Sequence, residues 1–101
     1  MRGVNHHKTM RFTLSISPQT ANKVVFAAIL VPPMLIVTER AQMPSHAVFM
    51  SALLQLPVVL VGQGTGDFWQ AIGEPHYVFR LEEIGLVKLV WRQVGFGIPN
   101  D

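Results

Sequence analysis

The stretch that decides the predicted fold is residues 36–47, which read IVTERAQMPSHA, followed at residues 56–59 by LPVV. Met34 to Thr38 is a short apolar run rich in branched residues, with proline before it and polar residues after it. Such a run predicts a buried strand. A loop from Glu39 to Met43 is expected to follow it.

A helix is predicted to begin at Pro44 and Ser45, because proline suits the first turn of a helix and serine suits its cap. Its predicted apolar stripe, at helical spacing, is Phe49, Ala52, Leu53 and Leu56. Pro57 ends this helix, and the uninterrupted apolar run Val58 to Val61 predicts a further buried strand.

Upstream of this centre, Arg11 to Ser17 alternates polar and apolar residues, which predicts a strand with Phe12, Leu14 and Ile16 on one face. Ser17 and Pro18 then resemble a helix cap and first turn. The spacing that follows predicts a helix ending before Pro32-Pro33, with an apolar face made of Ala21, Val24, Val25 and Ala28.

Downstream, the glycines Gly62, Gly64 and Gly66 predict a turn into a short helix around Phe68 to Ile72. Two closing strands are expected at Tyr77 to Leu81 and Leu86 to Trp91, although Leu81 to Trp91 also fits an amphipathic helix. The whole pattern predicts one α/β domain in the order βαβαβα followed by two strands. Its expected core is Ile36, Val37, Phe49, Leu53, Val59 and Leu60.

Composition limits the function classes. The chain has 101 residues, eight Lys and Arg against six Asp and Glu, and a net charge of only +2, so nucleic acid is not an expected partner. It contains no cysteine and no apolar leader before Ser17-Pro18, which permits a cytoplasmic location. Adjacent His6 and His7 lack further ligands, so no metal site is expected.

A membrane hairpin is the alternative to a soluble domain, because Val24 to Val37 and Ala47 to Gly62 are nearly free of charge. A spanning helix needs about 20 apolar residues. Proline interrupts both runs below that length, so a soluble domain without a membrane partner is the favoured prediction.

His46 is the candidate reactive residue. A neutral imidazole is a nucleophile near neutral pH, and its phosphorylated form remains a reactive donor. The residue falls in the first turn of the predicted helix, where unpaired backbone N–H groups and the helix dipole favour a phosphoryl group. Ser45 and the Ala47 region of the helix are expected to support that group.

The run Ile36 to Ala47, followed by Leu56-Pro57-Val58-Val59, resembles the mobile phosphohistidine domain of phosphoenolpyruvate-utilising enzymes such as pyruvate phosphate dikinase and phosphoenolpyruvate synthase. In that pattern an apolar strand leads through Thr-Glu or Thr-Asp and a Gly-Gly loop into a Ser-His-Ala helix start. The matching loop positions here are Thr38, Glu39, Ala41 and Gln42.

The resemblance implies a single swivelling β/β/α-type phosphohistidine domain over residues 11–95. A flexible N-terminus at 1–10, where basic residues cluster, and a C-terminal tail at 96–101 are expected beside it. It also implies a phosphoryl carrier, transiently phosphorylated on His46, that is one component of a phosphotransferase rather than a complete enzyme. Separate nucleotide-binding or pyruvate-binding kinase subunits would use Mg²⁺ with ATP or phosphoenolpyruvate, and this chain alone would bind no cofactor.

Two positions depart from the family pattern. Ala41-Gln42 replaces Gly-Gly, and Pro44 replaces the Thr often found two residues before the histidine. Glycines let a backbone approach phosphate closely. The departures therefore keep open an alternative function, a non-catalytic binding or regulatory module on the same swivelling fold.

Overall fold

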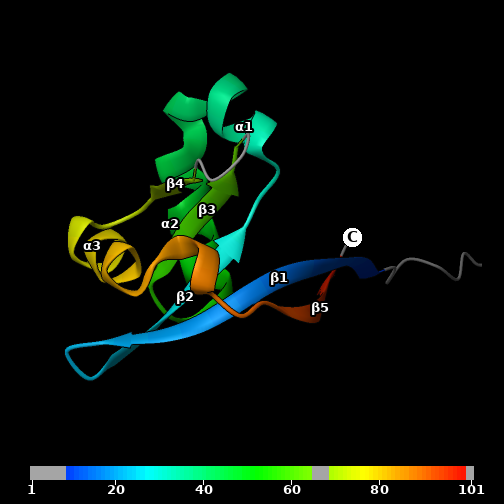
Figure 1. Ribbon diagram of the computed structural model, residues 1–101. Helices are drawn as coiled ribbons and strands as arrows, with labels where there is room; N and C mark the ends of the chain where they lie inside the picture. Colours follow the sequence, from blue (N-terminus) through cyan, green and yellow to red (C-terminus); the bar gives the residue numbers. More distant parts are fainter. Residues whose placement is uncertain (1–8, 65–68, 100–101) are drawn as a thin grey trace, which may run out of the picture.

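The computed structural model describes residues 9–64 and 69–99, and these form a mixed α/β domain around one sheet with strand order β4-β3-β2-β1-β5 (Figure 1). The strands are β1 (Thr9–Ala21), β2 (Val24–Leu30), β3 (Val58–Gln63), β4 (Trp69–Ile72) and β5 (Arg92–Pro99). The helices are α1 (Pro33–Thr38), α2 (Met43–Leu54) and α3 (Pro75–Ile84), with 3₁₀ helices at Arg40–Gln42 and Leu86–Lys88. The α/β class predicted from the sequence is confirmed, but the order of elements is not.

The sheet has a cluster of buried residues on each face, because successive residues of a strand point to opposite sides. One cluster joins the sheet to α1 and α2 and contains Ile16, Ala27, Ile29, Val58 and Leu60 with Ile36, Met43 and Ala47. The other joins it to α3 and the segment that follows and contains Phe26, Ala28, Val59 and Val61 with Tyr77, Leu81 and Leu89. Helices therefore cover both faces of the central strands.

The helix predicted from Ser17 to the prolines is wrong. β1 continues through Pro18 to Ala21, and a two-residue turn leads directly into β2, with Ala21 paired to Val24. Asn22 and Lys23 both have positive φ, at 50° and 68°, which is the type I′ geometry that matches the twist of a hairpin. Branched and aromatic residues after the turn then favour a strand.

The strand predicted at Met34 to Thr38 is also wrong, because these residues form α1. Pro33 occupies the first helical position, where its fixed φ suits a helix. β2 and β3 are neighbours in the sheet and pair in parallel from Ala27↔Val58 to Leu30↔Val61. A parallel pair needs a crossover that leaves the sheet, so no place between them remains for another strand.

The helix predicted after Pro44 is confirmed as α2, but its buried face differs from the predicted one. Met43 and Ala47 are buried, and Met50 and Leu54 pack against the same cluster. Phe49 is 59% exposed, so its prediction as a core residue is wrong. Because α2 is apolar nearly all round, hydrophobic spacing alone did not identify the face that contacts the sheet.

The other predicted core residues divide in the same way. Ile36, Val59 and Leu60 are buried as expected, Leu53 is half-buried, and Val37 is 73% exposed. The exposure of Val37 follows from α1 being a helix, in which neighbouring residues do not share a face.

The C-terminal third departs most from prediction. Trp69–Ile72 is strand β4, antiparallel to β3, instead of a short helix; Phe68 and the loop residues 65–67 lie outside the described residues. Tyr77 to Leu81 lies in α3 instead of a strand. Pro75 at the first helical position and the buried pair Tyr77 and Leu81, four residues apart, explain this helix.

The predicted strand Leu86 to Trp91 is a 3₁₀ helix and an extended connection, and the last strand begins only at Arg92. β5 pairs with β1 from Ile16↔Arg92 to Thr9↔Pro99, so residues 96–99 belong to the sheet. Within the described ranges, none of the helices combines the length and apolar character needed to cross a membrane.

Candidate functional site

The structure brings together two of the predicted site residues, His46 and Glu39. The imidazole Nε2 of His46 lies 3.3 Å from Oε1 of Glu39, and the two side chains are 49% and 46% exposed. His46 is in the first turn of α2, and Glu39 follows the end of α1. Because Nε2 faces the carboxylate, the neutral ring with its proton on Nε2 leaves Nδ1 as the atom with the free lone pair.

Two of the backbone N–H groups that precede His46 are already engaged. The N–H groups of Gln42 and Met43 both donate to the carbonyl oxygen of Glu39, at 2.9 and 3.1 Å. Pro44, the next residue, has no N–H to donate. The start of α2 continues from the preceding 3₁₀ helix, so its first donors are already engaged or missing.

The remaining predicted site residues make no hydrogen bond to the imidazole of His46 among the described residues. Thr38 donates its hydroxyl to the carbonyl of Met34 at 2.9 Å, which engages it within α1. Ala41 and Gln42 belong to the exposed 3₁₀ helix instead of a loop, and Ser45 is exposed beside His46. Ala47 is buried against the sheet at 6% exposure, so it faces the core.

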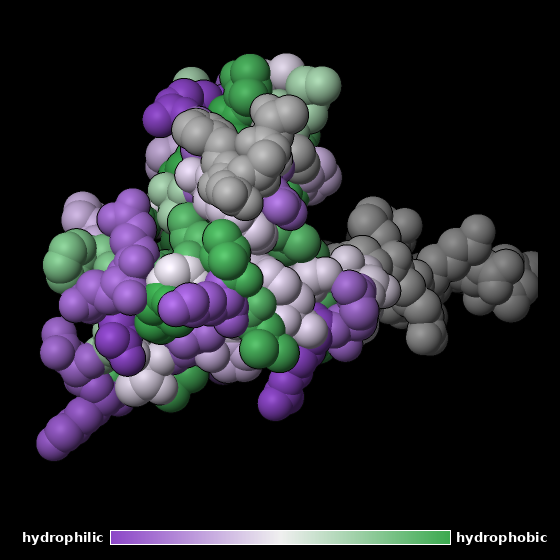
Figure 2. Space-filling view, viewed as in Figure 1, coloured by the Kyte–Doolittle hydropathy of each residue, from purple (hydrophilic) through white to green (hydrophobic). Residues whose placement is uncertain are grey.

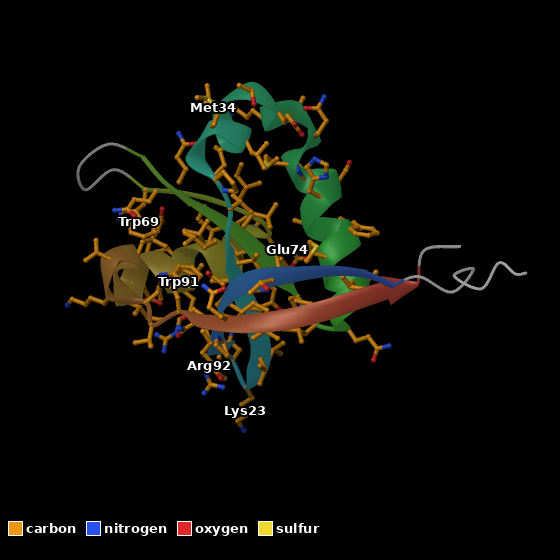
Figure 3. The ribbon with its side chains drawn as sticks, turned by 90° about the vertical axis from the view of Figure 1, so that its right-hand side faces the viewer. Lys23, Met34, Trp69, Glu74, Trp91 and Arg92 are labelled. Carbon is orange, nitrogen blue, oxygen red and sulfur yellow. The ribbon has the colours of Figure 1, made fainter. Side chains whose placement is uncertain are left out.

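A second candidate site, missed in the sequence, is a groove of about 670 Å³ between α2 and the start of α3. It lies at the end of the sheet where β3 begins and β4 ends. In Figure 3 the residue labelled Glu74 appears next to α2. The helix α2 contributes Pro44, Ala47, Val48, Ser51 and Ala52. The opposite wall contains Ile72, Gly73, Glu74, Pro75 and Tyr77, with Pro57 and Val58 between the two walls.

Small residues create the space. Ala47, Ser51 and Ala52 give the α2 wall short side chains, and Gly73 adds none. A Cβ at Gly73 would lie 3.0 Å from Cγ2 of Val59 and 3.2 Å from the carbonyl oxygen of Val58. A side chain at position 73 would therefore require Val58 and Val59 of β3 to give way by a few tenths of an ångström.

Polar groups in the groove are few and differ in their availability. Ser51 already donates its hydroxyl to the carbonyl of Leu56 at 2.7 Å. Tyr77 is 8% exposed, with its ring against Phe26, and its hydroxyl has no hydrogen-bond partner among the described residues. The carboxylate of Glu74 is 69% exposed, and its Oε2 lies 3.5 Å from Nε2 of His76.

The lining residues determine the charge of the groove. Glu74 is the charged residue among those that line it, and the lining includes neither Lys nor Arg. Apart from the nearby imidazole of His76, the carboxylate of Glu74 faces no Lys or Arg in the lining, and a carboxylate favours a cation or a hydrogen-bond donor over an anion. The sequence signal for this wall is Glu74-Pro75 followed by Tyr77 and Leu81, which fits the start of an amphipathic helix, whereas the sequence analysis predicts a strand from Tyr77 to Leu81.

Three His, Cys, Asp or Glu side chains placed to hold a metal ion occur nowhere in residues 9–64 and 69–99. Comparisons of the chain with protein-family models, curated proteins and solved structures found no match.

Proposed function

We propose that this chain is a non-catalytic binding module whose groove between α2 and α3 takes an apolar ligand that carries an amine. The observation that supports this proposal is the groove itself, with apolar walls, one carboxylate and one buried phenol. Its volume of about 670 Å³ is within the range of about 300–1,000 Å³ typical of small-molecule sites. Apolar burial supplies the affinity, and Glu74 selects for positive charge.

The test compares two probes that differ only in charge, 4-phenylbutylamine and 4-phenylbutyrate, titrated into ¹⁵N-labelled protein and followed by amide chemical shifts. The amine should shift the amides of α2 and of the start of α3, and it should bind more tightly than the acid. Ala52→Phe, which fills the exposed side of the groove, should weaken both probes.

Glu74→Gln should remove the preference for the amine while keeping the apolar contribution. An exposed ion pair is worth roughly 0.2–1 kcal/mol, which corresponds to a loss of amine affinity of up to about five-fold. The matched control is Glu83→Gln at the far end of α3, where the carboxylate lies 3.8 Å from Nη1 of Arg80. Equal binding of amine and acid, or an equal loss in the control, would refute the proposed selectivity.

A second candidate function is the phosphoryl carrier implied by the resemblance, together with its swivelling phosphohistidine fold. The observation that favours it is the pair of His46 and Glu39. With the Nε2 proton held toward Glu39, Nδ1 of His46 attacks phosphorus, the bond from phosphorus to the donor's leaving oxygen breaks, and the phosphoryl group stays on Nδ1. The engaged amides of Gln42 and Met43 make this the second candidate.

Phosphoramidate, a small chemical phosphoryl donor, tests the carrier without a partner protein. His46 should be labelled faster than His76, which provides an internal control because its Nε2 also lies near a carboxylate and its side chain is 54% exposed. Peptide mapping should place the acid-labile group on His46, ³¹P NMR should assign it to Nδ1, and His46→Ala should remove it. Equal rates at both histidines would argue against the carrier.

A further inference from the structure

The carboxylate of Glu74, the charged group of the groove, has a histidine beside it. Nε2 of His76 lies 3.5 Å from Oε2 of Glu74. Glu74 immediately precedes α3 in an extended conformation, and Pro75, the first residue of the helix, separates the two. Glu74 is among the residues that line the groove and His76 is not. His76 therefore reaches the charged group without being part of the groove wall.

The imidazole of His76 also packs on an aromatic ring. The ring centroids of His76 and Tyr77 are 3.8 Å apart, with an angle of 45° between the two planes. Tyr77 is itself buried against Phe26, so its ring is held by the core of the domain. This packing restricts the positions that the imidazole can take and favours those near Glu74.

Protonation of His76 changes the charge that a ligand meets at Glu74. Histidine gains its positive charge as the pH falls from about 8 to about 5, a range in which glutamate and a primary alkylamine both keep theirs. At the upper end of this range, Glu74 faces a neutral imidazole and its charge is available to an amine. At the lower end, the imidazolium pairs with the same carboxylate, and an amine has to compete for it.

The other charged groups near this pair do not change in the same pH range. On α2 the titratable side chain is His46, which does not line the groove, and β4 has none. On α3, Nη1 of Arg80 lies one turn beyond His76 and 3.8 Å from Oε1 of Glu83, which offsets its charge. Among the described residues beside Glu74, His76 is therefore the group that changes charge near neutral pH.

We infer that His76 competes with the amine of the ligand for the carboxylate of Glu74, which makes the charge preference of the groove depend on pH. The inference rests on the proposed function of the groove and adds the residue that regulates its selectivity. Preference for a cationic ligand is greatest where His76 is neutral and falls as His76 gains a proton. Binding of the apolar part of the ligand does not depend on that proton.

The test compares 4-phenylbutylamine with the uncharged 4-phenylbutanol, titrated into ¹⁵N-labelled protein at about pH 5.5 and about pH 8. The affinity of the amine relative to the alcohol should be roughly two- to five-fold higher at the higher pH, which is the range that an exposed ion pair supports. His76→Gln keeps a hydrogen-bond donor without a titrating charge and should make the two ratios equal. Glu83→Gln, which leaves Glu74 and His76 unchanged, should keep the difference.

The wild-type protein offers a second measurement, because the coupling between ligand and proton is reciprocal. Saturating amine should lower the pH at which the imidazole of His76 titrates by up to about 0.7 of a pH unit, the equivalent of five-fold. The C–H resonances of the ring report this titration. His46, whose Nε2 lies 3.3 Å from Glu39, is the internal reference and should titrate at the same pH with and without the amine.

The outcomes separate this inference from the proposed function. Binding of the amine at pH 8 with the same affinity ratio at pH 5.5 would overturn the competition and leave the proposed function intact. Persistence of the pH dependence in His76→Gln, or an equal effect of the amine on His46 and His76, would also overturn it. Failure of both probes to bind at either pH would refute the proposed function, and the inference with it.

Discussion

The two long apolar runs of the chain, Val24–Val37 and Ala47–Gly62, both change structure at proline but in opposite orders. The first is a strand followed by a helix, β2 and then α1, whereas the second is a helix followed by a strand, α2 and then β3. Proline therefore marks where each run changes without saying which half is helical. The order is decided by the residues at the start of each half.

The first run follows a hairpin turn, and the second follows a helical turn. Asn22 and Lys23 adopt positive φ and return the chain antiparallel to β1, so Val24 and Val25 can only continue as a strand. Ala47 comes after Met43 and Pro44, which already have helical geometry. The helices of the two runs also differ in length, since α1 has six residues and α2 has twelve.

The largest expected effect is a difference in the free energy of unfolding between alanine variants of two phenylalanines, one from each run. Phe26 in β2 is 0% exposed and stacks on Tyr77 with ring centroids 4.7 Å apart, whereas Phe49 in α2 is 59% exposed. Phe26→Ala should lower the free energy of unfolding by about 3–5 kcal/mol, because it opens a cavity between β2 and α3. Phe49→Ala should change it by less than about 1 kcal/mol.

Urea denaturation measures both values, and the pair controls for residue type. A large loss of stability for Phe49→Ala would mean that α2 packs with its opposite face toward the sheet. In that case the sequence-based choice of Phe49 as a core residue would have been correct. A small loss for Phe26→Ala would remove the evidence that α3 covers the second face of the sheet.

Local sequence was sufficient for some elements and insufficient for others. The alternation of β1 is typical of a strand, and the apolar run of β3 begins directly after a proline that ends the preceding helix; both strands were predicted. The turn at Asn22-Lys23 was missed because lysine at positive φ gives no sequence signal of the kind that glycine gives. Without that turn, Ser17-Pro18 appeared to begin a helix.

Topology decided the second group of errors. Met34 to Thr38 has the composition of a strand, but the parallel neighbours β2 and β3 leave it no position in the sheet. Figure 2 shows apolar residues among the polar ones on the surface over α3 and the segment after it. Val87 and Val90, which follow α3 in the chain, are 63% and 77% exposed. Such exposed apolar residues weaken the contrast from which a helix is distinguished from a strand in sequence.

The candidate sites divide in the same way. His46 and its surroundings were found because the histidine lies in a short linear motif, and its pairing with Glu39 comes from two residues seven positions apart. The groove between α2 and α3 joins residues 44–58 to residues 72–77, and it exists only once the sheet brings β3 and β4 together. A linear pattern could not reveal it.

The smallest expected effect is at two residues with left-handed backbone conformation, one before the strand of the first apolar run and one after the helix of the second. Lys23 precedes β2 with φ of 68°, and Gln55 ends α2 with φ of 60°. A side chain with a Cβ is disfavoured in this region and glycine is not, so Lys23→Gly and Gln55→Gly should each raise the free energy of unfolding by roughly 0.5–1 kcal/mol. Lys23→Ala and Gln55→Ala, which keep the Cβ, should give no such gain.

Differential scanning calorimetry of the variants at matched protein concentration gives the order of their stabilities. Equal stability of the glycine and alanine variants at position 23 would show that the type I′ turn does not direct the first apolar run into a strand. Equal stability of the two variants at position 55 would show that the left-handed cap is not the signal that ends α2 in the second apolar run.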